Sequence, residues 1–174
     1  MTTTPIYEPF VASIKNAKKK VVKIPLDNKD NNWSINLEKL KKNIQSKTSC
    51  LFFCNPHNPT GKVFSKKDLM EIGRFCKSKN LTIVSDEVHS ALILDKDKKH
   101  YPFAKQSKDI CKRTVTLQSA SKAFNIPGLG CAFAIASNHV LRRKIQATMK
   151  GIVHHIGSLG LIATESAFSK GDGW

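Results

Sequence analysis

The sequence Thr114-Val115-Thr116-Leu117-Gln118-Ser119-Ala120-Ser121-Lys122 joins an apolar, β-branched run to a turn that carries serine and lysine. The run predicts a buried strand, and Pro127-Gly128-Leu129-Gly130 disfavours an immediate long helix after it. A lysine just beyond a core strand has a rigidly held backbone, and its stem crosses apolar surface. We expect the ammonium of Lys122 to be partly desolvated, which lowers its pKa and makes the amine a nucleophile or base. The alternative is an ordinary solvated lysine, because the chain has 29 Lys and Arg residues.

Strand-like and helix-like segments alternate on both sides of this stretch. Apolar runs predict strands at 21–25, 51–54, 81–84, 114–118 and 131–136, and apolar spacing predicts helices at 9–19, 138–149 and 157–169. Two further helices are signalled by their first residues. Asn36 can cap a helix with the apolar stripe Leu37, Leu40 and Ile44, and Ser65 with Asp68 resembles a capping box. The polar segment 27–32 is expected to be a loop.

The predicted strands are continuous apolar runs, which is typical of strands buried on both faces. Alternation with helices therefore predicts an α/β fold with a mostly parallel sheet and helices on both faces. Ligands of such sheets bind beyond the carboxyl ends of the strands. Three polar clusters fall at those ends: 55–61, 86–89 and 119–122. We expect them to meet at one site.

The composition excludes several classes of protein. No apolar run is long enough to span a membrane, and no secretory signal is visible at the N-terminus. Five cysteines without a Cys-x-x-Cys pair are typical of reduced thiols in a cytoplasmic protein. The net charge of +16 could indicate nucleic-acid binding, but the lysines form short scattered runs without interleaved aromatic residues. We interpret them as solvated helix faces and expect neither a nucleic-acid nor a membrane partner.

Two other motifs fail on inspection. Gly61-Lys62 lacks the earlier glycine and the following Ser/Thr of a phosphate-binding loop. Ser119-x-x-Lys122 matches the serine–lysine motif of penicillin-binding proteins, but the companion Lys-Thr-Gly is absent and the companion Ser-Asp-Asn is replaced by Ser85-Asp86-Glu87. The histidines have no metal-ligand spacing, so no metal site is predicted.

Taken together, three motifs resemble a known family. Asn-Pro-His-Asn-Pro-Thr-Gly at 55–61, Ser-Asp-Glu-Val-His at 85–89 and Ser-Ala-Ser-Lys-Ala-Phe-Asn at 119–125 resemble fold-type I pyridoxal-phosphate enzymes of the class I/II aminotransferase superfamily. Thr4-Pro5-Ile6-Tyr7 and His100-Tyr101-Pro102 are similar to the MalY/PatB-type cystathionine β-lyases, also called cysteine-S-conjugate β-lyases. The resemblance runs essentially from residue 4 to residue 174.

The resemblance implies a role for each matching position. Lys122 would form the Schiff base with pyridoxal 5'-phosphate and act as the catalytic residue, and Asp86 would pair with the protonated pyridine nitrogen. The other implied cofactor contacts are Asn58 and His89 near the phenolic oxygen, Tyr7 stacked on the ring and Ser119 on the phosphate. Taken singly, each has a structural alternative: Asn58 could shape a turn, Asp86 could cap the next segment, and Tyr7 could be ordinary core.

The implied reaction is α,β-elimination on cystathionine or cysteine conjugates, giving pyruvate, ammonia and a thiol. A pyridoxal-phosphate-dependent aminotransferase shares the early steps and remains an alternative, as does a non-catalytic binding or regulatory module with the same fold. A nucleic-acid binder that uses the +16 charge is a third alternative. It would associate with random DNA in a strongly salt-dependent way.

Members of this family are more than twice as long as this chain. The resemblance implies that residues 1–174 are the central part of the cofactor-binding large domain, without the N-terminal segment and the C-terminal small domain. We therefore expect the fragment alone to be poorly active and the full-length form to be a homodimer acting on a small amino acid. Gly130 stands where many aminotransferases carry an arginine that binds the phosphate.

Overall fold

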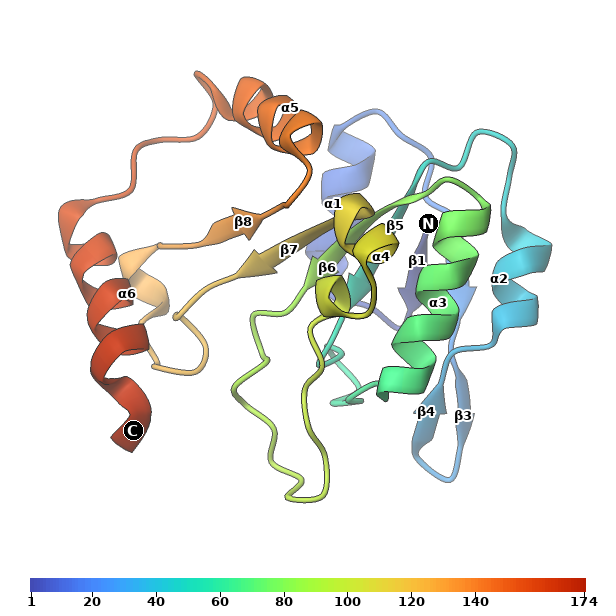
Figure 1. Ribbon diagram of the computed structural model, residues 1–174, viewed down its shortest axis with the longest axis horizontal. Coiled ribbons are helices and arrows are strands. Elements are labelled where there is room, and N and C mark those ends of the chain that lie inside the picture. The colour runs from blue at the N-terminus through green and yellow to red at the C-terminus, as the bar shows by residue number, and fades with distance from the viewer.

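The computed structural model describes residues 1–174, which form a six-stranded sheet, a separate two-stranded hairpin and six helices (Figure 1). The strands are β1 (Thr2–Thr4), β2 (Lys23–Pro25), β3 (Asp27–Lys29), β4 (Asn32–Ser34), β5 (Cys50–Cys54), β6 (Thr82–Asp86), β7 (Thr114–Gln118) and β8 (Phe133–Ile135). The helices are α1 (Glu8–Asn16), α2 (Leu37–Asn43), α3 (Lys66–Ser78), α4 (Lys108–Arg113), α5 (His139–Met149) and α6 (Ser158–Lys170). Short 3₁₀ turns lie at Phe103–Lys105, Pro127–Leu129 and Gly171–Gly173.

The main sheet has the strand order β2-β1-β5-β6-β7-β8. All its pairs are parallel except the last, in which β8 runs antiparallel to β7. The predicted α/β fold with a mostly parallel sheet is therefore confirmed. Because β1, β5, β6 and β7 are parallel, their carboxyl ends share one edge of the sheet, where residues 55–61, 86–89 and 119–122 follow.

Helices cover both faces of the sheet. Leu51 and Phe53 of β5 join Leu40 of α2 and Leu69 of α3 in the main hydrophobic core. Phe52 points to the opposite face, because side chains alternate along a strand, and its ring meets that of Phe10 on α1 at 5.8 Å. The larger core thus lies between the sheet and α2, α3 and α4, while α1 covers the other face (Figure 1).

Both predicted helix starts are confirmed. The Asn36 side chain accepts hydrogen bonds from the backbone N–H groups of Glu38 and Lys39. Ser65 and Asp68 form a reciprocal capping box at the start of α3. Such caps satisfy N–H groups that the first turn of a helix leaves free.

Several expectations need correction. Residues 27–32 are not a loop but the hairpin β3–β4, because Asp30 and Asn31 adopt the positive φ values of 51° and 62° that a tight turn requires. The helix predicted at 9–19 ends earlier: α1 stops at Asn16, and Ala17 is exposed just past its end. The strand at 131–136 shortens to β8, whose three residues are exposed at the edge. The short elements β1 and α4 were not predicted.

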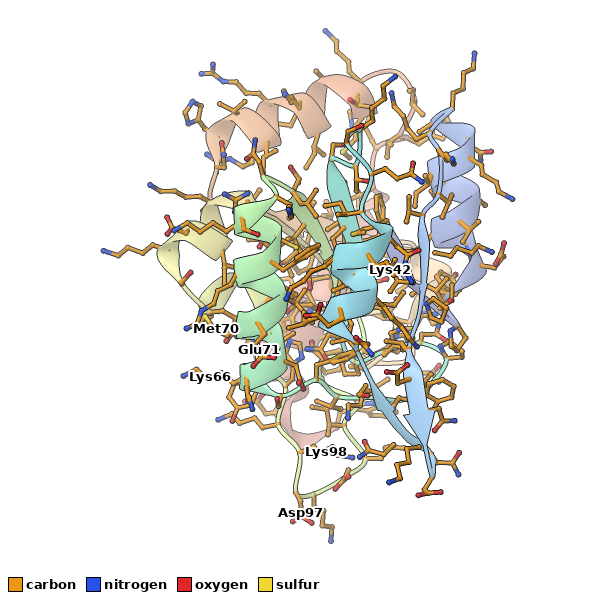
Figure 2. All side chains as sticks on the ribbon, turned by 90° about the vertical axis from the view of Figure 1, so that its right-hand side faces the viewer. Lys42, Lys66, Met70, Glu71, Asp97 and Lys98 are labelled. Carbon is orange, nitrogen blue, oxygen red and sulfur yellow. The ribbon has the colours of Figure 1, made fainter.

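The lysine runs lie on exposed helix faces and loops, as the sequence indicated. Lys42 on α2 and Lys66 at the start of α3 are exposed, and Lys98 projects with Asp97 from the loop between β6 and β7 (Figure 2). The five cysteines form no disulfide. None of the helices combines the length and the apolar character that a membrane crossing requires.

Candidate active site

A cavity of about 460 Å³ opens at the carboxyl edge of the sheet, within the ~300–1,000 Å³ range of small-molecule sites. It is lined by all six residues that the sequence singled out: Tyr7, Asn58, Asp86, His89, Ser119 and Lys122. They lie at the end of, or just beyond, four parallel strands, β1, β5, β6 and β7. The expected meeting of the polar clusters is therefore observed.

Asp86 and Lys122 give this cavity opposite charges. Asp86 is the last residue of β6 and is half-buried, and burial raises the pKa of its carboxyl group. The Val88 N–H, which donates to Oδ1 at 3.2 Å, and the charges of His89 and Lys122 partly offset this effect. Asp86 therefore caps the next segment with one oxygen while still lining the cavity.

Lys122 lies in the turn after β7, as predicted, but its surroundings differ from the expectation. The residue lines the cavity but is exposed rather than partly desolvated. Its amine makes no hydrogen bond or ion pair within the protein. A free amine and a half-buried carboxylate thus border the same space.

Tyr7 is not core. Its side chain is 46% exposed, it precedes α1, and its ring meets Phe10 edge-on at 6.1 Å. The aromatic face is consequently available to a ligand in the cavity. Phe10 holds the ring from the protein side.

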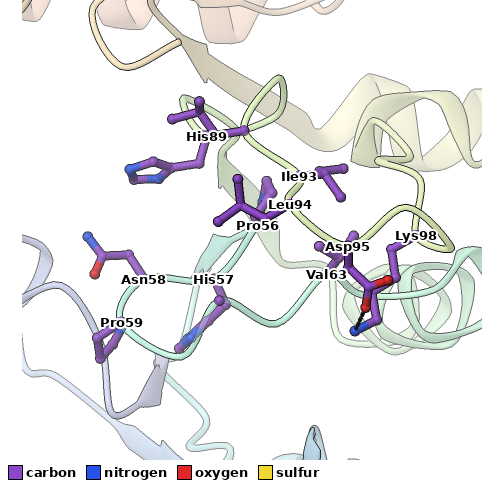
Figure 3. A pocket seen from close by; sticks show the side chains of 12 residues that line it. Pro56, His57, Asn58, Pro59, Val63, His89, Ile93, Leu94, Asp95 and Lys98 are labelled. Carbon is purple, nitrogen blue, oxygen red and sulfur yellow. Dashed lines mark ion pairs between the residues drawn. The ribbon is translucent and has the colours of Figure 1, made fainter. Parts of the chain in front are cut away.

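Asn58 and His89 line both this cavity and an adjoining one of about 360 Å³. Figure 3 shows the two side chains in the adjoining cavity. The adjoining cavity is walled by proline and aliphatic side chains and ends at the exposed Asp95–Lys98 ion pair. Both half-buried side chains border the two cavities, so they can contact a ligand in either one.

His57 fixes the turn that presents Asn58. Its buried ring lies 3.3 Å from Thr3 Oγ1 through Nε2 and 2.9 Å from Thr60 Oγ1 through Nδ1. Burial lowers the pKa of His57 to about 4. The neutral ring therefore joins the end of β1 to the turn that follows β5.

Ser119 lines the cavity with its hydroxyl already engaged. Its Oγ donates to the Cys131 carbonyl at 2.6 Å and accepts from the Ser121 N–H at 3.1 Å. A phosphate bound here would have to exchange the first of these bonds. The Ser119 hydroxyl, for which the resemblance implies a contact with the phosphate, is thus part of the turn in this chain.

Sequence reasoning missed other lining residues, chiefly Cys54 and Cys131. Cys54 pairs with Asp86 in the register of β5 and β6, and burial raises the pKa of its thiol to about 12. The thiol is therefore uncharged beside the carboxylate. The shared end point of the two strand-like runs was the signal that could have found Cys54.

Known proteins agree with this geometry. The model of the class I and II aminotransferases matches residues 1–170. Cystathionine beta-lyase PatB of Bacillus subtilis is 36% identical over 98% of this chain and 44% of that protein, and an aspartate aminotransferase of Pyrococcus abyssi is 34% identical over 84% and 37%. The crystal structure of cystalysin from Treponema denticola, which contains a pyridoxal 5'-phosphate cofactor, has a TM-score of 0.92 at 32% identity, over 99% of this chain and 44% of that one.

The chain thus spans less than half the length of these relatives, and it aligns with them over most of its own length. The three motifs, the parallel sheet and the cavity at its carboxyl edge all lie within the matched residues. The chain therefore belongs to the class I and II aminotransferase family.

Proposed function

We propose that this chain is the central, cofactor-binding part of a pyridoxal-phosphate-dependent carbon–sulfur β-lyase. In this proposal a longer protein adds an N-terminal segment and a C-terminal small domain, and two copies assemble in the cytoplasm. The proposal rests on one observation: Lys122 and Asp86, which follow neighbouring strands, border one cavity together with Tyr7, Asn58 and His89. The name of the Bacillus subtilis relative supports a lyase.

The residues fit the cofactor on chemical grounds. A half-buried carboxylate with a raised pKa is stabilised by a cation, and a protonated pyridine nitrogen is such a cation. The free amine of Lys122 can condense with an aldehyde and release water. The exposed face of Tyr7 suits a flat cationic ring. When bound, pyridoxal phosphate supplies a sink for the electrons released at the substrate Cα.

The chain's own groups then have defined tasks. The amine of Lys122 would hold the cofactor through its aldehyde group and, when free, would accept the proton from the substrate Cα. Asp86 would hold a proton at the ring nitrogen, and Asn58 and His89 would contact the ring. Loss of the sulfur substituent from Cβ and hydrolysis convert an S-substituted cysteine and water into pyruvate, ammonia and a thiol.

The first test asks whether Lys122 captures the cofactor. We expect pyridoxal phosphate to give a visible absorption band with the chain, and borohydride reduction with peptide mapping to locate the adduct on Lys122. Lys122→Ala should lose the band, while Lys144→Ala on α5 should keep it. An adduct spread over exposed lysines in both variants would contradict the proposal.

An aminotransferase is the second candidate, favoured by the 34% identity to the Pyrococcus abyssi aspartate aminotransferase. The two reactions share proton removal by Lys122 and differ in the products. Incubation with cystathionine should release pyruvate and a thiol in a Lys122-dependent way, and the isolated chain should do so slowly. Exchange of amino groups with a 2-oxo acid, without thiol release, would favour the aminotransferase.

A further inference from the structure

Glu87 is the only Asp or Glu among the buried residues, and the proposed chemistry does not use it. Its Oε1 accepts hydrogen bonds from Ser85 Oγ at 2.9 Å and from the Phe103 N–H at 3.0 Å. Its Oε2 pairs with His100 Nε2 at 2.9 Å, and the two side chains are only 3% and 11% exposed. A buried carboxylate is costly unless it is fully paired. Its presence here calls for a function.

The groups around Glu87 come from both ends of one loop. Ser85 belongs to β6, whereas His100 and Phe103 follow the segment 88–99. Phe103 is itself buried, and its ring meets Phe53 of β5 edge-on at 5.4 Å. Glu87 therefore ties the outgoing end of this loop to its return into the core.

The loop held in this way carries part of the candidate site. His89 and Val88 line the main cavity, and the Val88 N–H donates to Asp86 Oδ1. Side chains alternate along β6 and beyond it, so Asp86 faces the cavity while Ser85 and Glu87 face the core side. A shift of Glu87 would move Asp86 and His89 directly through the backbone.

His100 makes the arrangement sensitive to the chemistry of residue 87. Its Nδ1 is buried without a hydrogen-bond partner. In the tautomer with a proton on Nε2, this nitrogen donates to the Glu87 carboxylate. Nδ1 is then an acceptor without a hydrogen bond, and no donor is left unpaired. A glutamine amide that turned its N–H toward Nε2 would drive that proton to Nδ1 and bury an unpaired donor, which costs about 1–3 kcal/mol.

We propose that Glu87 and His100 form a buried clamp that positions Asp86 and His89 for the cofactor. The positioning role rests on the proposed function, whereas the clamp itself is a property of the free chain. The simple alternative is a pair that adds stability without affecting the site. Two measurements separate these readings.

The first measurement is amide hydrogen exchange on the cofactor-free chain. We expect Glu87→Gln and His100→Phe to accelerate exchange over residues 87–103 about tenfold, the equivalent of ~1.4 kcal/mol. Amides of α1 and α2 should be unchanged. His100→Gln, which restores an N–H donor, should recover most of the protection. Asp109→Asn breaks the exposed Lys77–Asp109 pair and serves as the matched control without effect.

The second measurement is the dissociation constant of pyridoxal phosphate and the absorption spectrum of the lysine-bound cofactor, taken well below the unfolding midpoint. We expect Glu87→Gln and His100→Phe to weaken binding about tenfold, with His100→Gln close to wild type. Ser85→Ala removes one donor and keeps the contact between Glu87 and His100, so it provides a milder variant with a smaller change in the same direction.

Wild-type affinity and spectrum in variants that only lower the unfolding midpoint would overturn the positioning role. Unchanged exchange over 87–103 would overturn the clamp. Failure of the wild-type chain to bind pyridoxal phosphate would instead refute the proposed function and with it the positioning role. In that case the exchange result still decides whether the clamp exists.

Discussion

Asp86 illustrates how a residue proposed to bind the cofactor can weaken its own fold. Burial raises the pKa of its carboxyl group, so ionisation is less favourable in the folded chain than in the unfolded one. Above the folded pKa the charged form carries this cost in full. As the pH falls through the folded pKa toward 3.8, the folded chain takes up the proton first and the cost disappears.

We therefore expect Asp86→Asn to raise the thermal unfolding midpoint of the cofactor-free chain at pH 7. The gain should shrink toward zero as the pH approaches 3.8, and differential scanning calorimetry across this range measures it. Asp97→Asn, at the exposed loop tip, should give no gain at either pH. A lower midpoint for Asp86→Asn at pH 7 would show that the buried charge of Asp86 does not destabilise the folded chain.

His57 makes the stability of the fold depend on pH in the opposite direction from Asp86. Its folded pKa of about 4 lies below the ordinary 6.5, so its contribution is present above pH 6.5 and is lost as the pH falls toward 4. At 1.36 kcal/mol per pKa unit this amounts to a loss on the order of 3 kcal/mol. His57→Gln should flatten the pH dependence of unfolding between 6.5 and 4, as measured by urea titration. If the stability of His57→Gln fell equally steeply with pH, the pH dependence would come from other groups.

At the level of elements, α3 packs against α4 through Gly73 and Ile110. A Cβ atom added at Gly73 would overlap Ile110 Cδ1, its nearest neighbour, and come within 2.8 Å of Ile110 Cγ1, and Ile110 is buried. Gly73→Ala should gain about 1 kcal/mol of helix propensity and lose about 1–3 kcal/mol through overpacking. We expect a net destabilisation in chemical denaturation.

Removing the obstructing atom provides the check. The double variant Gly73→Ala, Ile110→Val should have a higher free energy of unfolding than the two single changes predict when added. The shorter side chain at position 110 leaves room for the new methyl group. Gly128→Ala, whose new methyl group meets nothing within 4 Å, is the matched control. Simple additivity in the double variant would show that the two positions do not interact.

The elements that sequence predicts best are those fixed by near neighbours. The caps at Asn36 and Ser65 depend on residues two or three positions away, so they are readable. The direction of β8 is not readable, because an apolar run is the same for parallel and antiparallel pairing. The strand β1, with the sequence Thr-Thr-Thr, forms only because β2 and β5 flank it on either side.

The same limit applies to the site. Asp86 at the end of β6 and Lys122 in the turn after β7 could be assigned to one cavity because parallel strands end at one edge. The exposure of Lys122, the engaged hydroxyl of Ser119 and the link from Glu87 to His100 depend on loops that return from far along the chain. The spacing of residues in the sequence does not show which distant loop residues come to lie at the site.

Across the whole molecule, apolar exposure is concentrated in the C-terminal quarter. Large side chains there are exposed on or near α5 and α6, among them Ile152 at 74%, Leu159 at 73% and Ile162 at 62%. Patches of this kind bind apolar ligands in the native state. We expect the folded chain to enhance the fluorescence of anilinonaphthalene sulfonate.

Replacing Ile152, Leu159 and Ile162 by glutamine should reduce this signal several-fold while leaving the far-ultraviolet circular dichroism unchanged. Lysines on α2 are exposed but not apolar, so Lys42→Gln is the control and should have no effect. Full dye fluorescence in the triple variant would locate the apolar surface elsewhere.

The cavity takes its walls from residues as far apart as Tyr7 and Lys122. The ribosome synthesises these residues in order, so the cavity is incomplete until β7 and the turn after it have left the exit tunnel. During synthesis the earlier strands and helices exist without a place for a ligand. Ligand capture can thus begin only after the segments from Tyr7 to Lys122 have been made, and it cannot guide the folding of those made first.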